Sequence, residues 1–189
     1  MAKKVAIIFG SPRKESNTHI LVKEARRGLN DSGVESEIFF LNDMDIKGCQ
    51  ACGYCKMNDT TDCAVKDDMP RIHRAMEASD GVIVASPVYF GLVTAQTKVW
   101  LDRLFTYYGP GHAIPGHKKA AFIFTQNSPD EKMFQNNLDW FMNVTKLVGF
   151  EPNGTLVAPD LSKGAKPMAT EHPEYMKKAY ELGKSLLDG

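Results

Sequence analysis

The chain has 189 residues, of which 43% are apolar and 24% are charged, a composition typical of a globular protein with one substantial core. Its 23 basic and 23 acidic side chains cancel, so the charge gives no support for a general nucleic-acid or membrane-surface binder. No segment approaches the roughly 18 consecutive apolar residues of a membrane span, and the apolar run from Val5 to Phe9 is too short for a signal peptide. We therefore expect a cytoplasmic protein.

Short apolar runs alternate with helical patterns along the chain. Strands are predicted at Lys4–Phe9, Glu35–Phe40, Gly81–Ser86, Lys119–Phe124 and Thr155–Ala158. Helices are predicted at about 18–32, 67–78, 94–107 and 131–147, and again towards the end of the chain, with a loop over 160–172. This alternation predicts an α/β fold with an open parallel sheet and helices on both faces. We expect one domain over residues 1–189, with a cysteine-rich loop at 47–66 inserted after the second strand.

The loop after the first strand, GSPRKESNT, has the composition of an anion site. Its polar side chains are Ser11, Ser16, Asn17 and Thr18, and Arg13 adds positive charge. The following helix directs its free N–H groups and the positive end of its dipole at the same space, which suits a phosphate. The alternative is that Ser16 or Asn17 only caps the helix.

The loop after the third strand, SPVYFGLVT, carries two aromatic side chains beside a glycine. Tyr89, Phe90 and Gly91 suit a flat heteroaromatic ligand, or else they pack in the core or against another subunit. Ligands of open α/β sheets bind beyond the carboxyl ends of the strands, so this loop and the first favour a mononucleotide with a flat ring. The polar loop at 125–129 could close over the same ring. Neither an ATP-type P-loop nor a dinucleotide fingerprint is found.

All four cysteines lie in one stretch of fifteen residues, with the spacing C-x2-C-x2-C-x7-C. They are Cys49, Cys52, Cys55 and Cys63. Four thiolates suit a [4Fe–4S] cluster or zinc, and the three-residue spacing is characteristic of cluster ligation. A metal-free loop of reduced or disulfide-bonded thiols is the third interpretation. In a reducing compartment, such a group is more often metal-binding or catalytic than a structural disulfide framework.

Three motifs together resemble a known family. GSPRKESNT, SPVYFG and the run WLDR at Trp100–Arg103 are similar to the flavodoxin-like NAD(P)H-dependent FMN reductases. The cysteine motif followed by KDDM at Lys66–Met69 resembles the iron–sulfur flavoprotein branch of that family. The resemblance covers the chain to about Ala158. It implies a flavodoxin-like sheet of five strands in the order 2-1-3-4-5, together with tightly held FMN.

The resemblance also implies roles for individual residues. The FMN phosphate would be held by Ser11, Arg13, Ser16, Asn17 and Thr18. The isoalloxazine ring would be framed by Pro87, Val88, Tyr89, Phe90 and Gly91, with Asn127 nearby. The four cysteines would ligate a [4Fe–4S] cluster. Members of the family form homodimers, often paired into tetramers, with FMN near a subunit interface. No side chain is assigned as catalytic.

The expected function is an FMN-dependent oxidoreductase that transfers electrons from NAD(P)H or a ferredoxin-type protein to a small-molecule or protein acceptor, with the cluster as relay. Alternatives are an FMN reductase with a metal-free loop, an electron carrier without a substrate of its own, and a non-catalytic interaction protein. The sequence identifies neither the donor nor the acceptor.

Two expectations concern the environment of the cysteine loop. Because it follows the second strand, we expect it at the same carboxyl edge as the FMN loops. The family resemblance implies that it approaches the flavin of a neighbouring subunit there. Asp102 and Arg103 are expected to form a structural ion pair with each other.

Overall fold

The computed structural model describes residues 2–161 and 167–188, and its centre is a parallel sheet. The five long strands lie in the order β2-β1-β3-β5-β6, with the short β4 paired antiparallel to β3. Their bounds are β1 Lys4–Phe9, β2 Glu35–Phe40, β3 Gly81–Tyr89, β4 Leu92–Val93, β5 Lys118–Thr125 and β6 Phe150–Ala158. When the five parallel strands are counted along the chain, this is the predicted order 2-1-3-4-5, and the flavodoxin-like α/β fold is confirmed.

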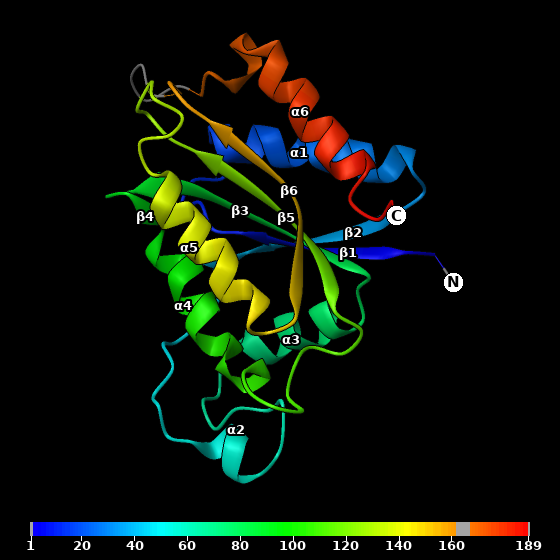
Figure 1. Ribbon diagram of the computed structural model, residues 1–189, viewed down its shortest axis with the longest axis vertical. Coiled ribbons are helices and arrows are strands. Elements are labelled where there is room, and N and C mark those ends of the chain that lie inside the picture. Colours follow the sequence, from blue (N-terminus) through cyan, green and yellow to red (C-terminus); the bar gives the residue numbers. More distant parts are fainter. Residues whose placement is uncertain (1, 162–166, 189) are drawn as a thin grey trace.

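Helices cover both faces of the sheet (Figure 1). One face carries α1 (Asn17–Asp31) and α6 (Pro173–Lys184), and the other carries α3 (Met69–Glu77), α4 (Ala95–Arg103) and α5 (Gln135–Lys146). Short 3-10 helices are η1 (Leu41–Asp43), η2 (Leu104–Tyr107) and η3 (Ala169–Glu171). None of the helices in the described ranges is long and apolar enough to cross a bilayer.

The alternation of side chains explains why both faces are apolar. In β3, Val82 and Val84 pack in the core beneath α3, α4 and α5, whereas Ile83 and Ala85 pack in the core beneath α1 and α6. All four side chains are fully buried. A strand buried on both faces reads as a continuous apolar run, which is why this strand is recognisable in the sequence.

The structure differs from the sequence prediction in several boundaries. The helix expected at 94–107 changes at Leu104 into the 3-10 helix η2, and β6 begins at Phe150 rather than Thr155. The helix expected from 131 begins only at Gln135. A four-residue helix that was not predicted, α2 (Tyr54–Met57), lies within the cysteine loop. Of the loop expected at 160–172, residues 162–166 lie outside the described part of the chain, and η3 occupies 169–171.

A buried ion pair holds the cysteine loop on the body of the protein. The side chains of Arg103 and Asp67 are 1% and 0% exposed and are directly paired, and Arg103 Nη1 also donates to the Lys47 carbonyl at 2.8 Å. Burial opposes ionisation of Asp67, but hydrogen bonds from Arg103 and from the backbone N–H groups of Lys47 and Met69 lower its pKa below the ordinary value. The predicted Asp102–Arg103 pair was wrong: Asp102 bonds Lys98 one helical turn earlier.

Two glycines let α1 and α6 lie in close contact. A Cβ atom at Gly28 would overlap the backbone of Tyr180, and one at Gly183 would overlap the backbone of Ala25. The absence of side chains therefore brings the two helix backbones together above the sheet.

Replacing Gly183 with Ala should separate these helices and lower the free energy of unfolding by about 1–3 kcal/mol, the usual cost of overpacking. Urea denaturation measures the change. Gly48→Ala is the matched control, because a Cβ atom there meets nothing within 4 Å. Equal stability of the two variants would contradict the close-contact interpretation.

Replacing Arg103 with Met should leave the Asp67 carboxylate buried without its partner and cost about 3 kcal/mol. Because the folded pKa of Asp67 is depressed, the pair stabilises the wild type above about pH 4 and loses this contribution as the pH falls through the folded pKa. The variant should therefore differ less from the wild type in acid.

Denaturation of both proteins at several pH values tests this. Lys98→Met, which breaks the exposed Lys98–Asp102 pair on the same helix, should cost under about 1 kcal/mol. A destabilisation by Arg103→Met that is as small as in this control would contradict the role assigned to the buried pair.

Candidate functional site

The first loop of the site is supported by the start of α4. The Thr94 hydroxyl donates to the Gly10 carbonyl at 2.6 Å, and a Cβ atom at Gly10 would overlap the Thr97 hydroxyl. The Gly10 N–H donates to Ala85 on the neighbouring strand at 2.8 Å. The chain leaving β1 is thus fixed on both sides before it turns towards α1.

The N-terminus of α1 has backbone N–H groups available to an anion. Ser16 is the N-cap, and its hydroxyl accepts from the His19 N–H at 3.2 Å, so the capping interpretation of Ser16 is correct. Within the described residues, the N–H groups of Asn17 and Thr18 have no acceptor, as expected for the first turn of a helix. Arg13 is exposed beside them and has no carboxylate partner in the described part of the chain.

The side chain of Asn17 has a structural role. Its Nδ2 donates to the Leu161 carbonyl at 2.5 Å, and its Oδ1 accepts from the N–H groups of Met168 and Ala169 at 2.6 and 2.8 Å. Both acceptor positions of the amide oxygen are therefore used. What Asn17 offers to a ligand is chiefly its backbone N–H.

Two hydroxyls of the predicted phosphate group are also oriented by internal contacts. Ser11 Oγ lies 3.2 Å from both the N–H and the carbonyl of Arg13, within one turn. Thr18 Oγ1 lies 2.7 Å from Thr125 Oγ1, which joins α1 to the end of β5. The hydroxyls are thus held in place before any ligand arrives.

A tight turn presents the aromatic side chains of the second loop. Phe90 and Gly91 have φ values of 49° and 80°, and β3 pairs with β4 on either side of them. Two successive positive φ values match a type I′ hairpin turn. Phe90 is fully exposed and Tyr89 is half-exposed. A phenylalanine in the left-handed region is strained, and such strain is found chiefly at functional sites.

The loop after β5 provides a third wall. Gln126 is 4% exposed, and its Nε2 donates to the Asp130 carbonyl at 2.7 Å. Its Oε1 is buried and has no partner among the residues that the structure describes. Asn127 is exposed next to it. Sequence reasoning named Asn127 but missed Gln126, although a polar residue directly after a buried strand was a usable signal.

The three loops enclose one cavity of about 290 Å³. Its lining includes the predicted residues Ser11, Arg13, Ser16, Asn17, Thr18, Pro87, Val88, Tyr89, Phe90 and Asn127, together with Thr125, Gln126 and Leu161. Gly91 is predicted but does not line the cavity, because it lies behind the turn, where Asn137 Nδ2 donates to its carbonyl at 3.0 Å. Free N–H groups at one end and aromatic side chains at the other fit a phosphate joined to a flat ring, as in FMN.

The four cysteines lie elsewhere. All are free thiols; Cys49 and Cys52 are exposed, and Cys55 and Cys63 are half-buried. Cys63 Sγ accepts from the Val65 N–H at 3.4 Å.

The thiols are the donor type that a [4Fe–4S] cluster needs, but their placement does not fit one. Among the described residues, no three Cys, His, Asp or Glu side chains are arranged to hold a metal.

The cysteine loop is anchored at the end of α4 that is remote from the cavity. Lys56 Nζ donates to the carbonyls of Thr106 and Tyr108 at 2.9 and 2.6 Å, and the Thr106 hydroxyl donates to the Thr60 carbonyl at 3.0 Å. Helix α4 has nine residues and spans about 13 Å.

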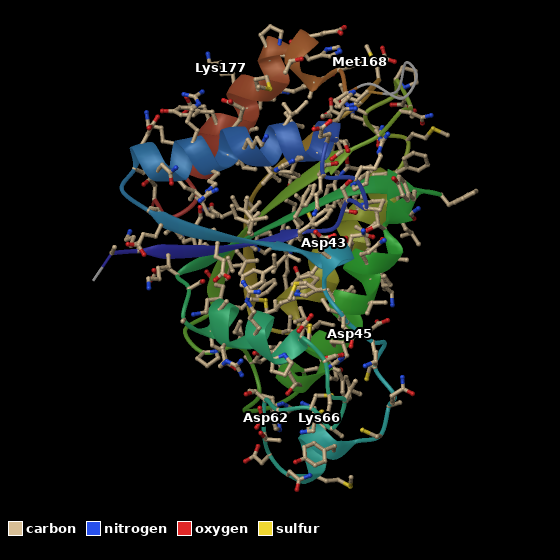
Figure 2. The ribbon with its side chains drawn as sticks, turned by 180° about the vertical axis from the view of Figure 1, so that it is seen from behind. Asp43, Asp45, Asp62, Lys66, Met168 and Lys177 are labelled. Atoms are coloured by element: carbon tan, nitrogen blue, oxygen red, sulfur yellow. The ribbon has the colours of Figure 1, made fainter. Side chains whose placement is uncertain are left out.

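Figure 2 places Asp62 and Lys66 of this loop at the opposite end of the molecule from Met168, which bonds to Asn17 at the cavity. Within one chain, these loop residues therefore lie far from the cavity, and the approach of the loop to the flavin of a neighbouring subunit stays a prediction.

Comparison with known proteins identifies the family. Residues 3–142 match the family described as NADPH-dependent FMN reductase. An iron-sulfur flavoprotein of Archaeoglobus fulgidus is 40% identical over 188 residues, which cover 98% of this chain and 79% of that protein. Another from Methanosarcina thermophila is 34% identical over 139 residues, 72% of each chain. The match to an iron-sulfur flavoprotein of Methanocaldococcus jannaschii is 43% identical but spans only about half of each chain, 53% of this one and 51% of that one.

Solved structures share the fold at low sequence identity. An NAD(P)H:quinone oxidoreductase from Methanothermobacter marburgensis superposes with a TM-score of 0.80 at 17% identity, covering 100% of this chain and 99% of that one. An FMN-dependent NADH-azoreductase from Bacillus anthracis, solved in complex with FMN, has a TM-score of 0.73 at 12% identity. The match covers 98% of this chain and 100% of that one. The chain thus belongs to the NADPH-dependent FMN reductase family of FMN-dependent oxidoreductases, in its iron–sulfur flavoprotein branch.

Proposed function

We propose that the cavity at the carboxyl edge binds FMN and that the protein transfers electrons from NAD(P)H or a ferredoxin-type protein to a small-molecule or protein acceptor in the cytoplasm. The observation that carries this proposal is the convergence of the loops after β1, β3 and β5 on one cavity. When bound, FMN supplies the redox chemistry, because it accepts a hydride or two electrons and releases them singly or in pairs.

The residues of the chain would bind and orient this cofactor. The N–H groups of Asn17 and Thr18 would donate to the phosphate, and Arg13 would add a charge-assisted contact. The Pro87–Phe90 segment would form a wall for the ring. The half-exposed Tyr89 and the exposed Phe90 leave this side open to a second molecule.

Purified protein should be yellow, and the flavin released on denaturation should be FMN. Turnover of NADH, NADPH and reduced ferredoxin, each with ferricyanide or a quinone, identifies the donor. If apoprotein prepared without oxidation binds no FMN when it is added, the proposal fails.

Replacing Arg13 with Met should weaken FMN binding about tenfold, because a charged hydrogen bond to the phosphate is lost. Riboflavin, which lacks the phosphate, should bind the variant and the wild type equally. Fluorescence quenching of each flavin by apoprotein measures both constants. The matched control is Arg26→Met, which removes an exposed arginine of α1 away from the cavity. A similar loss for riboflavin would show that Arg13 does not act through the phosphate.

We also propose that the cysteine loop ligates a [4Fe–4S] cluster that relays single electrons between FMN and an outside partner. The family branch and the four thiols on one loop support this, whereas the separated thiols of the structure do not. The proposal includes a homodimer or homotetramer, in which the loop of one chain lies near the flavin of another.

Wild-type protein should contain iron and sulfide in the ratio of a [4Fe–4S] cluster, and Cys52→Ala should lose both. The FMN content of the variant should stay unchanged, because none of the four cysteines lines the cavity. Anaerobic purification followed by iron, sulfide and flavin analysis tests this, with Gln50→Ala in the same loop as the control. Wild-type protein that holds FMN without iron would favour the metal-free thiol loop instead. Loss of FMN from the variant would show that the loop belongs to the flavin site.

A further inference from the structure

Exposed apolar side chains gather over α4 and α5. Trp140 on α5 and Leu147 at its end are 53% and 57% exposed, and Phe105 and Tyr108, which follow α4, are 44% and 47% exposed. In the described part of the chain, none of the exposed large apolar side chains belongs to α1 or α6. The surface over α4 and α5 is therefore the one that a partner would cover.

An apolar groove of about 180 Å³ lies in this surface, between α4 and α5. Its lining includes Leu101, Phe105, Tyr108, Trp140 and Leu147. Since the three aromatic side chains and Leu147 are about half exposed, covering them would bury about 400 Å². That is about half of the roughly 800 Å² that each partner contributes to a stable interface, and about half of such an area is apolar. The patch thus has the area of the apolar part of a stable dimer interface.

The same groove carries one positive and one negative side chain of α4. Lys98 and Asp102 line it, are about half exposed and pair with each other at 2.6 Å, one helical turn apart. If two copies of α4 met antiparallel, crossing midway between these residues, each Lys98 would lie level with Asp102 of the partner subunit. A parallel pair would instead place like charges level with each other. The charges therefore favour a second copy of this chain in the antiparallel orientation, because a two-fold interface must be self-complementary.

Helix α4 also connects the two functional ends of the chain. Thr94 at its start holds Gly10 of the first cavity loop, and Thr106 beyond its end bonds the cysteine loop. Figure 1 shows β4 and α2 beyond opposite ends of this helix. Antiparallel pairing would exchange these ends, so the cysteine loop of one subunit would come towards the cavity of the other.

We propose that the surface over α4 and α5 binds a second copy of this chain about a two-fold axis, with the two α4 helices antiparallel. This rests on the homo-oligomer included in the proposed function and identifies its interface. The apolar groove is covered by the other copy, and Lys98 pairs with Asp102 of the partner subunit. The cavity of each subunit then faces the partner's cysteine loop and not its own.

Leu147→Lys should raise the dissociation constant of the dimer at least about tenfold, because a charge would be buried at an apolar contact. Leu147 is the C-cap of α5, where a lysine suits the helix dipole, so the variant should fold, as urea denaturation can check. Asn30→Lys, which adds the same charge on an exposed position of α1, should leave the dimer unchanged. Sedimentation equilibrium measures all three proteins.

The orientation is tested by zero-length carbodiimide coupling in an equilibrated mixture of unlabelled and heavy-isotope-labelled protein. Lys98–Asp102 links within one chain show that the coupling works, because the two groups lie 2.6 Å apart. The antiparallel dimer should give the same link between a light and a heavy chain as well.

A monomeric wild type overturns this inference and leaves the surface to a different protein. An oligomer that Leu147→Lys does not weaken, or that gives no Lys98–Asp102 link between chains, overturns it too. Flavin analysis of the same samples separates this result from the proposed function. A dimer with the expected link that binds no added FMN would contradict the cofactor and leave the interface standing.

Discussion

Burial of both faces of the parallel sheet is the constraint on which the site depends. Apolar clusters under α1 and α6 on one side and under α3, α4 and α5 on the other fill both faces of the central strands. This packing favours binding of a polar ligand beyond the ends of those strands. At the carboxyl ends, free helix N–H groups and irregular loops are available together, and the chain builds its cavity there.

Much of this arrangement could be predicted because short segments of the sequence determine it. β-branched apolar runs predict the strands, and the polar and aromatic loops that follow them predict the lining of the cavity. What local patterns could not predict is how each polar group is used. The side-chain amide of Asn17 is fully hydrogen-bonded to the backbone of Leu161, Met168 and Ala169, far along the chain. The free acceptor of Gln126 becomes visible only once its amide nitrogen is seen to bond Asp130.

The position of the cysteine loop was also beyond prediction from local sequence patterns. The sequence shows that the loop follows β2, but the contacts that hold the loop in place come from residues far away in the sequence. Asp67 accepts from the Met69 N–H at the start of α3, as its place in the sequence suggests, but the same carboxylate also pairs with Arg103. Lys56 bonds carbonyls beyond the end of α4. Contacts between residues far apart in the sequence therefore set the position of the loop, and no spacing rule in the sequence encodes them.

Because the cysteine loop is fastened to the far end of α4 and its cysteines take no part in the cavity lining, it behaves as a detachable module. An ancestor could have gained it, and a descendant could shorten or lose it, while the flavin cradle stayed intact. Changes in the loop and changes in the cavity could then be selected separately. The same independence makes the loop a natural place to engineer a metal site without redesigning the cavity.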